Sequence, residues 1–167
     1  DMKPGQAERI CLTLFILYDL EKQRRRQMRY QRFGTGIVLR VDRDEEILDC
    51  LTQLCRKEEI RLASVTGLGA VKKAVLGVFD TNEKAYYKET YEGIYEIASL
   101  TGNITRQDGQ PYLHIHAVIA NGHTGEIHGG HVNEAVIGAT GELFIQILDG
   151  EVGRKFSEEI GLNLLDF

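Results

Sequence analysis

The sequence predicts an α+β domain with a mostly antiparallel sheet and a long amphipathic helix packed on it. A strand-like segment at 34–41 comes before the one clear helical apolar pattern. Short apolar segments typical of strands then follow, and they are separated by turns rich in glycine, aspartate and asparagine. The 167 residues suffice for one domain with its own hydrophobic core.

The first strand is predicted by the β-branched residues of GTGIVLRV at 34–41. The helix follows, because Asp42 or Asp44 can act as its N-cap and the helical pattern continues to about Glu58. The apolar residues that recur at helical spacing are Ile47, Leu48, Leu51, Leu54 and Cys55. We expect this apolar face to cover one side of the sheet.

The remaining strands are predicted at 61–66, 71–79, 85–91, 95–105, 112–120 and 143–148. Residues 132–137 are compatible with either a short helix or a strand. The glycine-rich segment TGLGA at 66–70 is expected to join two strands as a tight turn, or to allow close subunit packing. It does not open a helix, so we do not interpret it as a phosphate-binding loop.

Residues 1–27 differ from the rest of the chain. A short apolar run at 10–18 precedes the charged segment EKQRRRQ, and Met28 resembles a natural start. We expect an N-terminal extension, non-native or disordered, ahead of a domain at 28–167; an extra helix packing on the domain or on a partner is the alternative. The apolar run is shorter than the roughly 20 residues that span a bilayer, so no membrane association is expected.

The net charge and the cysteines indicate which functions and which cellular compartment the chain favours. The net charge of −5 disfavours a protein that binds nucleic acid without a partner, because phosphate contacts need a concentrated basic surface. The three cysteines, Cys11, Cys50 and Cys55, form no CxxC pair and are expected to be buried thiols. This use of cysteine predicts a protein of the reducing cytoplasm.

All five histidines lie between residues 114 and 131. If 112–120 is a strand, His114 and His116 share one face, and a neighbouring strand could bring His131 beside them. Three neutral imidazoles suit zinc or another divalent transition metal and leave a coordination position open. Alternatively, the histidines hydrogen-bond to the backbone or line a polar subunit contact.

Other residues near the cluster are weaker candidates for the site. His128 is a possible fourth metal ligand, and His123 is expected in an exposed turn. A general base in a metal-dependent hydrolase or lyase could be Glu126, Glu134 or Glu142, with Glu142 the best placed at the start of an apolar strand. A cupin is disfavoured because the residues after His116 are apolar where a glutamate would be needed.

Five segments in the same order resemble the PPC domain, the "plants and prokaryotes conserved" domain. They are TGLGAV at 66–71, LGVFD at 76–80, TGN at 101–103, PYLHIH at 111–116 and GGH at 129–131. The resemblance covers roughly 29–167. It implies an α+β domain with an antiparallel sheet that assembles as a homotrimer.

The resemblance also implies function. The histidine set that can hold zinc in prokaryotic members falls on His114, His116 and His131, whereas plant members mostly lack it, so the chain resembles the stand-alone prokaryotic type. Family members are commonly described as DNA-binding without a defined reaction. In the plant proteins an AT-hook contacts DNA, and no R-G-R-P core is present here. DNA and a small-molecule ligand both remain open as partners.

Overall fold

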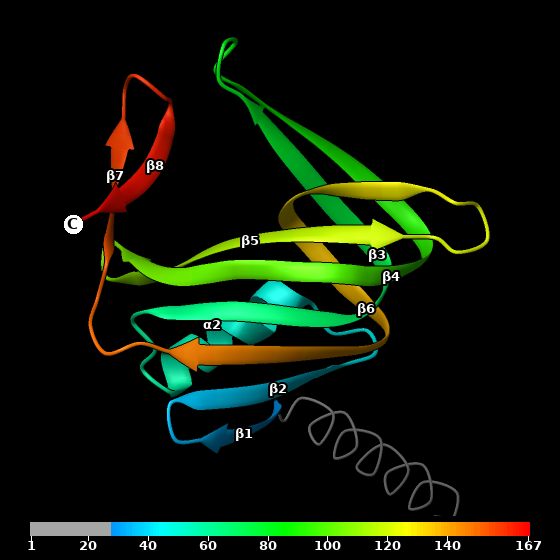
Figure 1. The fold of residues 1–167 in the computed structure, drawn as a ribbon, viewed down its shortest axis with the longest axis horizontal. Helices are drawn as coiled ribbons and strands as arrows, with labels where there is room; N and C mark the ends of the chain where they lie inside the picture. The colour runs from blue at the N-terminus through cyan, green and yellow to red at the C-terminus, as the bar shows by residue number, and fades with distance from the viewer. Residues whose placement is uncertain (1–27) are drawn as a thin grey trace, which may run out of the picture.

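The computed structural model describes residues 28–167; the predictions for residues 1–27, Cys11 among them, lie outside the described residues. The elements, shown in Figure 1, are β1 (Arg29–Phe33), β2 (Gly36–Asp42), α2 (Ile47–Lys57), β3 (Ala63–Asp80), β4 (Ala85–Gln107), β5 (Gln110–Ala120), β6 (Ile127–Ile147), β7 (Gly153–Ser157) and β8 (Leu162–Asp166). The β7–β8 hairpin was not predicted.

The main sheet is antiparallel, as predicted, and its strands have the order β1-β2-β6-β3-β4-β5. Strand β6 is long enough to pair with β2 near its C-terminal end and with β5 near its N-terminal end. The β5–β6 pairing closes β3, β4, β5 and β6 into a ring at that end of the sheet. β7 and β8 form a separate hairpin.

The strands are longer than the sequence suggested, and TGLGA is not a turn between strands. Residues 66–70 continue through β3, and the register against β4 shifts between Gly67 and Gly69. Gly69 has a φ of +149°, and a Cβ there would collide with the backbone carbonyl of Thr140 in β6. The glycines therefore allow β6 to lie close against β3 where the ladder is irregular.

The helix is also shorter than predicted. It has 11 residues and begins after Glu46, whose carboxylate accepts a hydrogen bond from the backbone N–H of Asp49. Asp42 and Asp44 do not cap it, because Asp44 has a left-handed φ of 71° and the backbone turns there before the helix begins. Its C-terminal cap is Glu58, in agreement with the predicted end.

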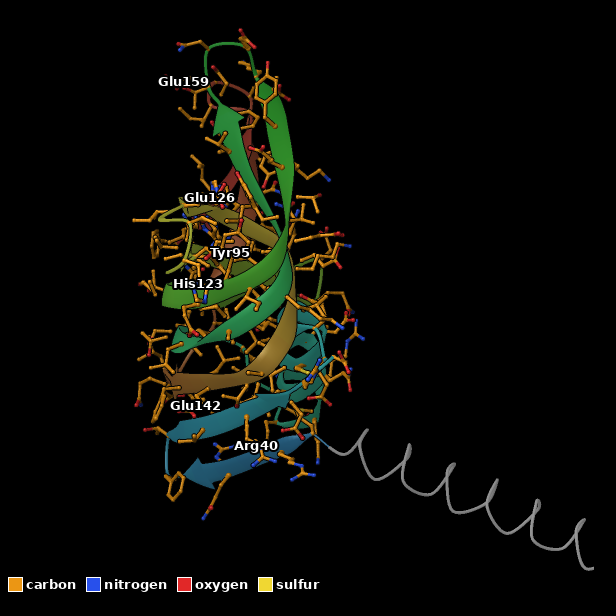
Figure 2. All side chains as sticks on the ribbon, turned by 90° about the vertical axis from the view of Figure 1, so that its right-hand side faces the viewer. Arg40, Tyr95, His123, Glu126, Glu142 and Glu159 are labelled. Carbon is orange, nitrogen blue, oxygen red and sulfur yellow. The ribbon has the colours of Figure 1, made fainter. Side chains whose placement is uncertain are left out.

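The hydrophobic core lies between α2 and one face of the sheet (Figure 2). The helix contributes the apolar residues predicted for that face, among them Leu51 and Leu54, which are fully buried. Cys50 and Cys55 are buried free thiols, as expected. Within residues 28–167 no helix is long and apolar enough to cross a membrane.

The other face of the sheet is not covered by α2. One row across it runs through Phe144, Thr66, Thr101 and His116, which are paired from strand to strand. Phe144 is 55% exposed there, and the nearby Leu68 is 54% exposed. The histidines of the candidate site therefore lie on the open face of the sheet, outside the hydrophobic core.

Candidate metal centre

Strand pairing brings the three predicted histidines together. His116 of β5 is the direct partner of His131 in β6, and His114 lies two residues earlier on the same face of β5. His131 pairs on its other side with Gly77 of β3. The closed end of the sheet thus places residues that are 15 positions apart in sequence side by side.

The imidazole nitrogens converge on one point. The Nε2 atoms of His114 and His116 are 3.2 Å apart, and one ring nitrogen from each of the three histidines lies within 4.8 Å of the others. Zinc–nitrogen bonds of about 2.0–2.1 Å in a tetrahedral site require ligand atoms a little over 3 Å apart. The separation of the His114 and His116 nitrogens matches that spacing, and the three histidines form a group that could hold a metal ion.

The surroundings of His114 and His131 favour the neutral form of these two imidazoles. Burial lowers the pKa of His114 to about 4, with help from the positive charges of His131, Arg154 and His116. The pKa of His131 is lowered by burial and then by His116. Neutral imidazoles have free lone pairs, which is the form that binds a metal.

The two other histidines do not join this group. His128 is three residues before His131 in an uninterrupted part of β6, so it points to the opposite face of the sheet. There it stacks on Tyr91, with ring centroids 3.9 Å apart. His123 is exposed in the turn after β5, as predicted.

None of the three candidate glutamates lies at the cluster. Glu126 accepts hydrogen bonds from the hydroxyls of Tyr95 and Thr124, and Glu134 forms an ion pair with Lys73 at 3.0 Å. Glu142 is exposed at the far end of β6, well separated from Glu126 in Figure 2. A general base at the site therefore does not come from these side chains.

A pocket of about 670 Å³ adjoins the histidines. It lies between the closed end of the sheet and the β7–β8 hairpin, and its walls include His114 and His131. The pocket is also lined by Tyr86, Asn103, Tyr112, Arg154, Leu162 and Leu164. The sequence interpretation assigned none of them to a site; Arg154, Leu162 and Leu164 lie beyond residue 148, where it predicted no helix or strand.

Arg154 holds the hairpin to the sheet. Its Nη2 donates to the side-chain oxygen of Asn103 at 2.8 Å, its Nε donates to the hydroxyl of Thr105 at 3.0 Å, and its Nη1 donates to the carbonyl of Asn163 at 3.1 Å. The guanidinium also lies 4.7 Å from the centre of the Tyr112 ring. Arg154 is therefore a fixed part of the pocket wall.

Tyr86 forms another part of the wall. Its ring centroid is 6.1 Å from that of His131, and the amide nitrogen of Asn133 donates to its hydroxyl at 2.8 Å. The same amide donates to the carbonyl oxygen of His131 at 3.1 Å. Tyr86 and Asn133 thus connect the strand that carries His131 to the rim of the pocket.

Residues 28–149 match the family model of the Plants and Prokaryotes Conserved (PCC) domain. This is the domain that the sequence motifs resemble. The chain belongs to this family. The motifs PYLHIH and GGH, which carried the resemblance, are the segments of β5 and β6 that bear the three histidines. Among curated proteins there is no match.

Several solved structures resemble this PCC-domain chain. A "putative DNA binding protein" from Bacteroides thetaiotaomicron is 28% identical with a TM-score of 0.80, and the match covers 84% of this chain and 97% of that one. The metal-containing protein from Archaeoglobus fulgidus is 32% identical with a TM-score of 0.76, over 84% and 98% of the two chains. A plant- and prokaryote-conserved protein from Pyrococcus horikoshii is 29% identical with a TM-score of 0.72, over 85% and 96%.

Proposed function

We propose that this PCC-domain protein binds one zinc ion, or another divalent transition metal, through His114, His116 and His131. The single observation that carries the proposal is the convergence of three imidazoles, with ligand atoms within 4.8 Å of one another, beside a pocket. The metal-containing relative from Archaeoglobus fulgidus supports it. Bound zinc would supply a Lewis acid with a position left for water or a substrate.

Metal content tests this proposal directly. We expect about one zinc ion per purified chain by elemental analysis, and a strong reduction in the His114→Ala and His131→Ala variants. The matched control is His128→Ala, because His128 lies on the same strand but on the opposite face. Metal content that is unchanged in both site variants would exclude the assignment.

A homotrimer is part of the same proposal. It is supported by the open sheet face, where large apolar side chains such as Phe144 and Leu68 are more than half exposed. Light scattering after gel filtration should give a mass of three chains, and Phe144→Glu should reduce it. A wild-type protein that is monomeric at micromolar concentration would contradict the trimer.

A metal-dependent enzyme, a hydrolase or lyase acting on a small molecule, is the second candidate function. The pocket beside the histidines favours it, since ligand sites commonly have volumes of about 300–1,000 Å³. Arg154, Tyr86 and Asn133 are then the residues that would orient the substrate. Turnover that a chelator abolishes and zinc restores would support an enzyme, whereas chelator-independent turnover would exclude this one.

DNA binding is a further candidate because of the description of the Bacteroides relative. On β1 and β2 of the present chain, Arg29, Arg32 and Arg40 each form an ion pair with a carboxylate, so their charges are partly neutralised. We therefore expect weak binding to an AT-rich duplex by fluorescence anisotropy at low salt. Tight binding that weakens steeply with added salt would reverse this ranking.

The cytoplasm stays our proposed compartment, supported by the two buried free thiols Cys50 and Cys55.

A further inference from the structure

The pocket beside the histidines has the opposite electrostatic character to the protein as a whole. The chain carries a net charge of −5, yet no aspartate or glutamate lines this pocket. Arg154 is the lining side chain with a permanent positive charge. A pocket that contains a cation and excludes carboxylates favours an anionic ligand.

Arg154 has no counter-ion within residues 28–167. Its three hydrogen bonds go to neutral oxygens, namely the Asn103 amide, the Thr105 hydroxyl and the Asn163 carbonyl. A guanidinium has more N–H donors than these bonds use. Arg154 is partly buried, and this burial lowers its pKa. An anion in the pocket would offset the cost of this burial.

The rest of the pocket is mainly apolar. The β7–β8 hairpin contributes Leu162, Leu164 and Leu165, and β5 contributes Leu113 and the ring of Tyr112. Such a surface gains free energy when it covers an apolar group, at about 25 cal/mol per Å² removed from water. The lining is therefore suited to a ligand with one charged end and an apolar body.

We propose that this pocket binds a small carboxylic acid, with its carboxylate at Arg154 and its apolar body against the leucines of the β7–β8 hairpin. This goes beyond the proposed metal centre, since the interaction with Arg154 needs no metal, although His114 and His131 line the same pocket. A ligand held in this way lies beside the imidazoles of His114 and His131.

A carboxylate fits this lining better than a phosphate. A phosphate monoester carries nearly two negative charges at neutral pH and is normally held by several cations or by a row of backbone N–H groups. This pocket offers one arginine in an apolar wall. One guanidinium matches one carboxylate in charge and can bind it with two parallel hydrogen bonds.

The test uses three probes of equal chain length, hexanoate, hexanamide and hexyl phosphate, in calorimetric titrations of the purified full chain. Titrations in EDTA isolate the Arg154 contribution, because no metal is then present to bind the probe. We expect hexanoate to bind at least tenfold more tightly than hexanamide, and more tightly than hexyl phosphate. Equal affinity for hexanoate and hexanamide overturns the proposal, and stronger binding of hexyl phosphate overturns the choice of a carboxylate.

A variant pair locates the interaction. Arg154→Gln should weaken hexanoate binding at least tenfold and leave hexanamide binding unchanged, whereas the matched control Arg43→Gln, at an exposed arginine outside the pocket, should change neither. Hexanoate binding that is equal in wild type and Arg154→Gln overturns the assignment. The comparison of hexanoate with hexanamide on the wild type needs no variant, so it tests whether the pocket selects a carboxylate even if Arg154→Gln does not fold.

The two proposals fail separately. If zinc content falls in the His114→Ala and His131→Ala variants but hexanoate binds no more tightly than hexanamide, the metal centre stands and the carboxylate pocket is overturned. If hexanoate binds selectively in EDTA but elemental analysis of the protein purified without EDTA finds no zinc, the anion pocket is supported and the metal centre is overturned.

Discussion

The phenol ring of Tyr86 lies directly over Gly77, and a Cβ on residue 77 would overlap the Tyr86 hydroxyl. We predict that Gly77→Ala displaces Tyr86 from beside His131 and breaks its hydrogen bond with Asn133. In urea unfolding, the cost of Gly77→Ala should be larger in wild type than in a Tyr86→Ala background, by about 1 kcal/mol. Identical costs in both backgrounds would show that the two residues are not coupled.

Gly69 should be much less tolerant of substitution than a glycine in an open turn. Gly69→Ala places a Cβ against the Thr140 carbonyl at a φ of +149°, so we expect it to cost about 2 kcal/mol or more. Gly122→Ala is the matched control, because no atom lies within 4 Å of the Cβ position there. It should change the unfolding free energy by less than about 0.5 kcal/mol. Similar costs at both positions would contradict the close approach of β3 and β6.

Glu46 should contribute to stability through both of its carboxylate oxygens. One accepts the Asp49 N–H at the start of α2, and the other accepts the Ala135 N–H of β6 at 2.8 Å. Glu46→Gln keeps one acceptor oxygen and Glu46→Ala keeps none, so stability should fall in that order, by about 1 kcal/mol per lost hydrogen bond. Equal stability of the two variants by denaturant unfolding would argue against the bridge between helix and sheet.

The titration of Glu46 should make the folding stability depend on pH. Burial is the largest influence on Glu46 and raises its pKa above 4.5. The folded state therefore binds more protons than the unfolded state as the pH rises from 4.5 through the raised pKa, and this group's contribution to stability falls over that interval. Glu46→Gln does not titrate, so the stability of wild type relative to the variant should decrease as the pH rises. A difference that is constant with pH would contradict the raised pKa.

The buried thiols should be chemically inert in the folded protein. Burial raises the pKa of Cys50 to about 12 and that of Cys55 to about 11, so neither forms thiolate at pH 8. A Cys11→Ser variant leaves these two as the remaining thiols of the sequence. Ellman's reagent should titrate neither of them in native buffer and both in guanidinium chloride. Rapid native reaction would show that α2 opens readily.

The faces of the strands could be predicted from the sequence because side chains alternate along a strand. His114 and His116 are two residues apart, and they share a face as the alternation requires. The partner strand for His131 could only be expected in general terms. Its position opposite His116 depends on the register of β5 and β6, which the sequence does not reveal locally.

Other parts of the molecule could not be predicted because they depend on distant contacts. The glycines at 67 and 69 resemble turn residues, yet they serve the close packing of β3 on β6. The role of Arg154 follows from hydrogen bonds to Asn103 and Thr105, about 50 positions earlier. No pattern within the hairpin itself indicates those partners.

The pairing of His116 with His131 also bears on how the chain folds. A slip of one residue between β5 and β6 would turn the His131 side chain to the opposite face of the sheet, away from the other two imidazoles. Only the correctly aligned chain can present all three rings to one ion. If the chain binds zinc as proposed, zinc uptake during refolding would report when these two strands reach their native alignment, and excess metal would favour that alignment over misaligned ones.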